Sequence, residues 1–273
     1  MLVNPTAPSR YLLTPGTRPS LEKLPTRDYF GMPQKAERVA AAHALAQEIG
    51  VLQQLLHATQ RHRLLVVLQG MDTSGKDGTI RSVFSAVAPL GVRAVNFRAP
   101  SAEERARDYL WRIHQHVPRT GEIVLFNRSH YEDVLVVRVQ GLISARECAQ
   151  RYHHLREFER MLVETGTTLV KIFLHISKDE QRERLQARID DPAKHWKLQP
   201  SDLEARRQWA DYMEAYEDAL RETSTPHAPW HVIPADSKTA RNLIVATLLR
   251  DCMVGLPLKP PDTTTDLSGL IIA

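Results

Sequence analysis

Cysteine is scarce in this sequence, and its scarcity excludes two common ways of stabilising a fold. Only two of the 273 residues are cysteines, Cys148 and Cys252, and they lie far apart with no CxxC spacing. Neither a disulfide framework nor a cysteine-based zinc site is therefore expected. Both thiols are predicted to be buried, in a reducing compartment.

Long apolar runs, repeats and leader-like segments are also lacking. No stretch approaches the roughly 18 apolar residues that cross a bilayer. The first 14 residues show no basic start followed by an apolar core. We therefore expect a cytoplasmic protein without a membrane partner.

The composition is that of an ordinary globular protein with a mild positive charge. Hydrophobic residues make up 42% and charged residues 25%, and 36 Lys and Arg face 32 Asp and Glu, with a pI near 9.1. The length suits one large domain or a domain with an insertion. The charge permits a polyanionic partner but does not require one.

The most informative segment is the glycine-containing loop that follows an apolar run at Leu64–Leu68. The run predicts a buried strand, and a helical pattern begins at Thr79 and extends to Leu90. A glycine, four residues and then Gly-Lys between a strand and a helix predict a phosphate-binding loop, whose backbone N–H groups surround an anion. The residues predicted to bind phosphate here are Gly70, Thr73, Ser74, Gly75, Lys76, Asp77 and Gly78.

Two acids depart from the usual form of such a loop. Asp77 follows the lysine, where Ser or Thr is expected, and Asp72 lies inside the loop. Because a carboxylate among phosphates is repulsive unless a divalent cation lies between them, Asp72 is predicted to bind magnesium or a magnesium-bound water. The alternative is a chance glycine-rich turn with solvated acids.

The order of the predicted elements indicates an α/β fold. Five strand–helix repeats predict a parallel sheet with helices on both faces. The other predicted strands are Arg93–Phe97, Glu122–Phe126, Thr168–Ile176 and Trp230–Pro234. Further helices are expected from Gln34 to the first strand, at 101–116, 144–164, around Leu185 and Ile189, at 201–222 and at 237–253, with capping boxes at Ser101, Ser144 and Ser201.

Flanking segments divide the chain further. Residues 1–33 contain six prolines and predict an extended arm on the surface. Residues 34–254 form the predicted domain, and the Pro- and Thr-rich residues 255–273 predict a loosely held tail.

Polar residues follow the predicted third strand, at the edge where ligands bind parallel sheets. Asn127 stands where an acid would normally hold the magnesium water. Either this amide acts through a water, or Glu132 or Asp133 supplies the missing charge. Arg128 is a candidate to bridge donor and acceptor phosphates, and the alternative is a structural Arg–Asp pair.

A cationic segment follows the predicted fourth strand, where nucleotide kinases carry a lid that closes over phosphates. Gln181, Arg184 and Arg188 share one helical face, and the residues of this segment predicted to bind phosphate are Lys178, Lys194 and Lys197. We predict a lid at about 178–222. The alternative is a solvated helix with ion pairs such as Glu180–Arg184. Trp209, Tyr212 and Tyr216 favour core packing over base stacking.

Several motifs in order resemble those of the family-2 polyphosphate kinases, over roughly residues 28–252. They are Gly70–Gly78, Tyr109–Arg112, Phe126–Asp133, His175–Gln181, Trp196–Leu198 and Thr225–Trp230. The resemblance implies a P-loop kinase of thymidylate-kinase-like fold, with a five-stranded parallel sheet and a helical lid. It also implies reversible transfer of phosphate between inorganic polyphosphate and nucleotides (ADP, AMP and ATP), with Mg²⁺ or Mn²⁺.

The resemblance extends to individual residues. It implies catalytic roles for Asp72, Lys76, Arg128, Arg184 and Arg188, a metal role for Asp72 and Asn127, and nucleotide binding at Arg98, Arg112, Glu132 and Asp133. Asn127 departs from the aspartate of much of the family and resembles the subgroup that accepts nucleoside mono- and diphosphates. Family members commonly form dimers or tetramers, so a homo-oligomer is expected.

Two other functions remain compatible with the sequence. One is an ATP-dependent nucleotide kinase of the same fold, because a loop that holds a triphosphate also holds a polyphosphate. The other is a non-catalytic protein that binds polyanions or nucleic acid, which would not need Asp72. A channel for a long anion requires further cations, for which Arg63, Arg81, Arg128 and Lys178 are candidates.

Overall fold

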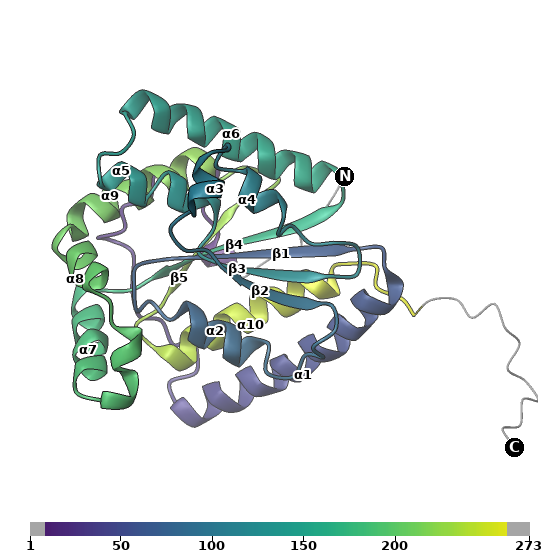
Figure 1. Cartoon of the computed structure of the whole chain (residues 1–273). Helices are drawn as coiled ribbons and strands as arrows, with labels where there is room; N and C mark the ends of the chain where they lie inside the picture. The colour runs from purple at the N-terminus through teal and green to yellow at the C-terminus, as the bar shows by residue number, and fades with distance from the viewer. Residues whose placement is uncertain (1–8, 261–273) are drawn as a thin grey trace, which may run out of the picture.

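A five-stranded, all-parallel β-sheet lies at the centre of the structure, in the order β2-β3-β1-β4-β5 (Figure 1). The structure is a computed structural model and describes residues 9–260. The strands are β1 Arg63–Gln69, β2 Val92–Asn96, β3 Ile123–Asn127, β4 Thr167–His175 and β5 Trp230–Pro234. The predicted fold class is confirmed, and each predicted strand is correct to within two residues.

Helices cover both faces of this sheet (Figure 1). One face carries α1 Lys35–Thr59, α2 Lys76–Val83 and α10 Lys238–Val254, and the other carries α6 Ala145–Glu164 and α9 Trp209–Thr223. Beyond the carboxyl ends of the strands lie α7 Lys178–Ile189 and α8 Pro200–Arg207. The shorter helices are η1 Ser9–Tyr11, α3 Ala102–Arg105, α4 Trp111–His114, η2 His130–Asp133, α5 Val136–Val139 and η3 Pro192–Lys197.

The central strand, β1, is apolar because both of its faces are covered. Its run from Leu64 to Leu68 is almost completely buried, and Val66 pairs with Leu125 of β3 and Val170 of β4. A continuous apolar run of this kind is typical of a strand in a parallel sheet with helices on both faces. It places the loop that follows β1 at the middle of the sheet edge.

The predicted helix at 101–116 is interrupted. Ser101 and Glu104 form the expected capping box, but α3 ends at Arg105. The side chain of Asp108 accepts hydrogen bonds from the backbone N–H groups of Leu110 and Trp111, and α4 begins at Trp111. Asp108 therefore competes with helix continuation and starts a new turn.

The predicted helix at 201–222 is also divided, and Ser201 is not its cap. Gln199 and Asp202 form the capping box of α8, with Pro200 at the first helical position. The chain breaks at Gln208 before α9 begins. The helix after the phosphate loop is shorter than predicted as well, because α2 ends at Val83.

The described part of the predicted amino-terminal arm, residues 9–33, contributes to the core and does not only lie on the surface. Tyr11, Leu13 and Leu21 are buried, and Leu12 forms an antiparallel bridge with His231 of β5. These apolar side chains explain why the arm packs closely. The predicted tail is described only as far as residue 260, so most of it lies outside the described residues.

Three further predictions can be compared with the structure. Cys148 and Cys252 are buried and free, as expected. Tyr212 and Tyr216 of α9 pack into the core. Within residues 9–260, no helix is both long and apolar enough to span a membrane.

Candidate active site

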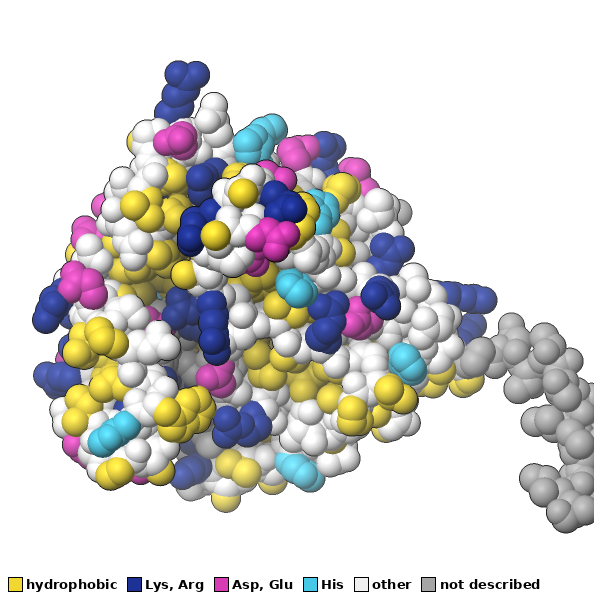
Figure 2. All heavy atoms as spheres, in the orientation of Figure 1, with side chains coloured by type: hydrophobic (Ala, Val, Ile, Leu, Met, Phe, Trp, Pro, Cys, Tyr) yellow, Lys and Arg dark blue, Asp and Glu magenta, His cyan; other side chains and the backbone are white. Residues whose placement is uncertain are grey.

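A large cavity lies at the carboxyl ends of the strands, between α7–α8 and the rest of the molecule. Its volume is about 1580 Å³. On the face drawn in Figure 2, dark blue Lys and Arg side chains gather around the hollow beside these strand ends. The cavity is lined by sixteen of the predicted site residues: Asp72, Thr73, Gly75, Lys76, Asp77, Gly78, Arg98, Arg112, Asn127, Arg128, Glu132, Asp133, Arg184, Arg188, Lys194 and Lys197.

Three residues predicted to bind phosphate do not line this cavity. Gly70 and Ser74 are buried members of the loop, and Lys178 is exposed to solvent outside the cavity. Arg63, a candidate for a long-anion channel, lies at the amino-terminal start of β1, the opposite edge of the sheet. Of the remaining channel candidates, Arg81 and Arg128 do line the cavity.

The loop after β1 has the curled backbone of an anion-binding turn. Gly70, Thr73 and Gly75 have φ values of 145°, 65° and 102°, in a region that glycine adopts easily. The Lys76 ammonium group is buried and donates to the carbonyl oxygen of Gly70 at 2.7 Å. Burial, together with the smaller effect of the nearby Arg128, lowers the pKa of Lys76 to about 8. An anion in the loop would favour the charged form of this lysine.

Arg128 links the phosphate loop to the carboxyl end of strand β3. Its guanidinium forms a close ion pair with Asp72 and a second with Glu132 at 3.1 Å. The positive φ of 61° at Arg128 turns the side chain toward the loop. The pKa of Arg128 is raised, first by Glu132 and then by Asp72 against the opposing effect of burial. The Arg128–acid pair considered from the sequence is therefore present, with Asp72 as a partner.

The carboxylate and amide oxygens at the loop suit a magnesium ion. Magnesium needs only one or two carboxylates, with phosphate and water oxygens completing its shell. Asp72 and Asp77 line the cavity, and the Asn127 side-chain amide donates to Asp77 at 2.5 Å. The buried hydroxyl of Thr73 has no hydrogen-bond partner among the described residues, which leaves it available to a phosphate or a water. The donor set therefore fits the metal that the family resemblance implies.

A buried ion pair forms the wall of the cavity beyond β2 and β3. Arg112 donates to Asp133 at 3.2 Å and to the carbonyl oxygen of Arg98 at 2.8 Å. Burial raises the pKa of Asp133, although Arg112 partly offsets this effect. Arg151, which the sequence analysis did not identify, donates to the backbone of Asp133 at 2.9 Å. Hydrogen bonds therefore hold the charged groups of this wall in place beside the cavity.

Arg184, the first predicted lid arginine, is held by hydrogen bonds within the protein. Its Nε donates to Glu180 at 2.8 Å, and its Nη1 donates to the carbonyl oxygens of Thr73 and Ser74 at 2.9 and 3.2 Å. Its Nη2 donates to the carbonyl oxygens of Ala235 and Asp236 at 2.8 and 2.9 Å. All five N–H groups are thus engaged, so in this structure Arg184 stabilises the loop through its backbone carbonyl oxygens.

The second lid arginine lies nearer the cavity mouth. Arg188 donates to the carbonyl oxygen of Lys197 at 2.9 Å and approaches Asp202 at 3.4 Å. Burial raises the pKa of Asp202, and the proximity of Asp72 raises it further. Gln181 on the same helix donates to the Asp72 carbonyl oxygen at 3.2 Å. The segment from α7 to α8 therefore contacts the phosphate loop directly, and its cavity-lining residues all precede α9.

A buried charge network behind η2 was missed from the sequence. Lys171 of β4 donates to Glu159 at 2.6 Å, to the Tyr131 hydroxyl at 2.9 Å and to the Thr223 carbonyl at 2.7 Å. Tyr131 and His130 also bond to Glu159. The sequence does contain an indication of this network, because Lys171 interrupts the apolar run of a central strand.

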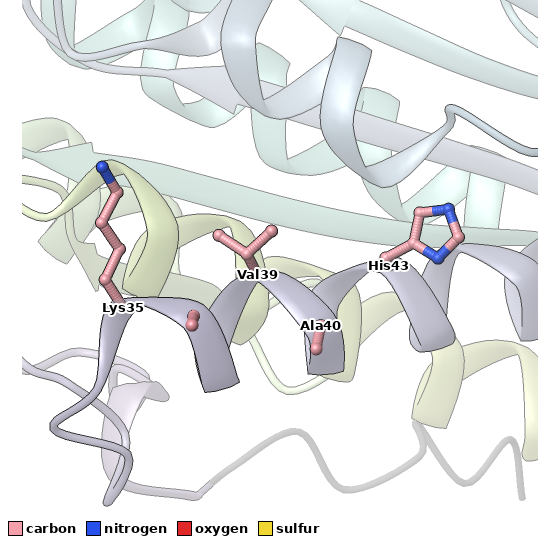
Figure 3. Close-up of a pocket in the computed structure, with 5 residues that line it drawn as sticks. Lys35, Val39, Ala40 and His43 are labelled. Carbon is pink, nitrogen blue, oxygen red and sulfur yellow. The ribbon is translucent and has the colours of Figure 1, made fainter.

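A second hollow on the surface lacks the phosphate loop and the clustered charged side chains of the large cavity. It lies along the outer side of α1, where Lys35, Val39 and His43 recur at four-residue steps (Figure 3). Val39 and Ala40 contribute only apolar surface, so this hollow lacks the convergent polar groups of the strand-edge cavity.

A comparison with family models decides the family. The model described as Polyphosphate kinase 2 matches residues 32–255. The chain belongs to the polyphosphate kinase 2 family. The resemblance seen in the sequence motifs is thereby confirmed.

Several relatives match along nearly their whole length. An AMP/ADP-polyphosphate phosphotransferase of Meiothermus ruber is 51% identical over 266 residues, covering 96% of this chain and 99% of the relative. An ADP-polyphosphate phosphotransferase of Rhodopseudomonas palustris is 42% identical and covers 91% and 90%. The crystal structure of polyphosphate kinase 2 from Arthrobacter aurescens TC1 superposes with a TM-score of 0.92 at 42% identity, covering 98% of this chain and 96% of that one.

Proposed function

We propose that this protein is a polyphosphate:nucleotide phosphotransferase, which transfers a phosphoryl group reversibly from inorganic polyphosphate to ADP and AMP. The observation that carries the proposal is the 51% identity, over almost the whole of both chains, with the Meiothermus ruber AMP/ADP-polyphosphate phosphotransferase. The cavity is consistent with this reaction, because it combines a phosphate loop with cations that follow each of the other four strands.

The chemistry asks for placement and charge neutralisation more than for a general base. An oxygen of the acceptor nucleotide's terminal phosphate forms a bond to the terminal phosphorus of polyphosphate, and the bond from that phosphorus to its bridging oxygen breaks. Lys76 and the loop N–H groups would hold the donor phosphate. Arg128 lies between the loop and the β3 edge, where it would neutralise charge that develops on the transferred group.

Magnesium or manganese is the expected cofactor. Asp72 is the first candidate to hold it, with Asp77 and Asn127 close by. When bound, the ion would neutralise phosphate oxygens and so relieve the repulsion between Asp72 and the polyanion. Asn127→Asp adds a charged ligand and is expected to tighten magnesium binding, which isothermal titration can measure without turnover.

The acceptor is expected to bind at the wall formed by Arg98, Arg112, Glu132 and Asp133. Arg98 lines the cavity while Arg112 is fixed by Asp133, so Arg98 is the better candidate for direct contact. Acceptance of both AMP and ADP would allow this protein to make ATP from AMP in two steps. A homodimer or homotetramer is also expected, and light scattering of the purified protein would measure it.

The deciding experiment is an assay with inorganic polyphosphate, magnesium and either AMP or ADP, with products separated by ion exchange. ATP from ADP, and ADP followed by ATP from AMP, are the expected products. The Asp72→Asn variant serves as the control for contaminating kinases. No transfer from polyphosphate, together with transfer from ATP to a nucleoside monophosphate, would instead identify an ATP-dependent nucleotide kinase.

A further inference from the structure

Arg241, in the first turn of α10, is a buried guanidinium whose partners are all neutral. Its Nη1 donates to the Ser74 carbonyl oxygen at 3.0 Å, and its Nε and Nη2 donate to the Asn242 side-chain oxygen at 3.1 and 2.8 Å. The residue is only 2% exposed, and no carboxylate perturbs it. Because a buried cation without counter-charge is costly, this arrangement needs an explanation.

The phosphate loop rests directly on this guanidinium. A Cβ atom at Gly75 would overlap Arg241 Nη1, so only glycine allows the contact. Arg184 donates to the same Ser74 carbonyl oxygen from another side, at 3.2 Å. Two guanidinium groups therefore meet at one turn of the loop. Arg184 has Glu180 as its counter-ion, and Arg241 has none within the described part of the chain.

Lys238 adds a third cation at this position. It lies three residues before Arg241, so the two side chains share one face of α10. Both line the large cavity, and Lys238 forms no ion pair or side-chain hydrogen bond among residues 9–260. Burial lowers the pKa of Arg241 to about 9 and also lowers the pKa of Lys238, with the charge of Arg184 as the next cause in both. An excess of positive charge thus faces the cavity beside the loop.

We propose that Lys238 and Arg241 form an anion subsite that binds phosphate groups of the polyphosphate next to the one that is transferred. The identity of this ligand rests on the proposed function. The subsite opens into the cavity that also contains Lys76 and Arg128. A chain of phosphates in the loop can therefore continue along the first turn of α10, where it supplies the counter-charge that Arg241 lacks.

The test compares two buried arginines that both lack a carboxylate partner. Arg38 of α1 donates to the carbonyl oxygens of Met32 and Pro33 and to the Thr239 hydroxyl, but it does not line the cavity. Thermal unfolding and calorimetric titration with tripolyphosphate, without divalent cations, would be measured for Arg241→Gln and for Arg38→Gln. For Arg241→Gln we expect a melting temperature that does not fall without ligand, and a loss of about tenfold in affinity for tripolyphosphate, as for a charge-assisted hydrogen bond. For Arg38→Gln we expect a lower melting temperature and unchanged affinity.

A lower melting temperature with unchanged affinity in Arg241→Gln would show a purely structural role and overturn the proposal. The exposed Lys238 provides a second variant if Arg241→Gln does not fold. Lys238→Gln is expected to weaken tripolyphosphate binding about fivefold, and unchanged binding would also overturn the subsite. A wild-type protein that binds tripolyphosphate but transfers no phosphate from polyphosphate would refute the proposed function alone. An active wild type with unweakened variants would refute the subsite alone.

Discussion

Replacing Lys171 by Met tests whether the buried network behind the active site stabilises the fold. The ammonium group is completely buried and donates three hydrogen bonds, to Glu159, Tyr131 and the Thr223 carbonyl. Methionine fills similar volume but leaves the Glu159 carboxylate buried without a cation. Breaking a buried pair in this way costs about 3–5 kcal/mol, a large part of the total stability of a typical domain.

The assay is urea unfolding of the wild type and variants, followed by circular dichroism. The double variant Lys171→Met/Glu159→Gln is expected to recover about 1–3 kcal/mol, because the glutamine is neutral and still accepts the Tyr131 hydroxyl. Arg160→Ala, which removes an exposed ion pair with Glu157, is the control and should leave stability nearly unchanged. A cost below about 1 kcal/mol for Lys171→Met, or a double variant no more stable than the single one, would refute this reasoning.

Three other predictions concern the phosphate loop. Asp72→Asn should abolish turnover while leaving the melting temperature nearly unchanged, and full activity would exclude a metal role for Asp72. Lys76 has a pKa of about 8 in the folded protein and a reference value of 10.5, so it should lose its proton, and kcat/KM for polyphosphate should fall, as pH rises through 8. Between pH 8 and 10.5 the unfolded chain binds more protons than the folded protein, so the free energy of unfolding of the wild type should rise relative to that of Lys76→Met. Denaturant unfolding over this pH range measures the difference between the two proteins. A difference in stability that does not change with pH would contradict the burial of a charged lysine. Arg184→Ala should lower both the melting temperature and kcat/KM, because it removes the four hydrogen bonds that join α7 to the phosphate loop and to the turn after β5. A slower enzyme with an unchanged melting temperature would instead indicate direct contact between Arg184 and phosphate.

The parts of the site that sequence predicts well are those fixed by strand order. Asp72 follows β1 and Asn127 ends β3, and these two strands pair in parallel, so both residues must lie at the same sheet edge. The spacing of Arg184 and Arg188 likewise predicts a shared helical face. The spacing also indicates the ion pair of Arg184 with Glu180. The other partners of Arg184 are backbone carbonyl oxygens of turns that are distant in sequence, and a residue pattern carries no information about those.

Helix boundaries were harder to predict for a related reason. The capping boxes at Ser101 and Ser144 were identified correctly, because their hydrogen bonds are local. Ser201 has the same spacing to an acid, but Gln199 with Asp202 caps the helix instead. Adjacent polar residues offer overlapping caps, and the choice between them depends on Pro200 and on contacts of Asp202 with Arg188.

Four of the five hydrogen bonds of Arg184, those to backbone carbonyl oxygens outside α7, also determine which part of the lid is free to move. They join α7 to the phosphate loop and to the turn after β5, so the helix up to this residue belongs to the same rigid body as the sheet. Swinging α7 away would break all of them at once. Opening of the cavity is therefore expected to occur beyond Arg188, by displacement of η3 and α8. This displacement would have to break the ion pair between Arg188 and Asp202 and the hydrogen bonds from Arg206 of α8 to Lys178 and Gln181 of α7.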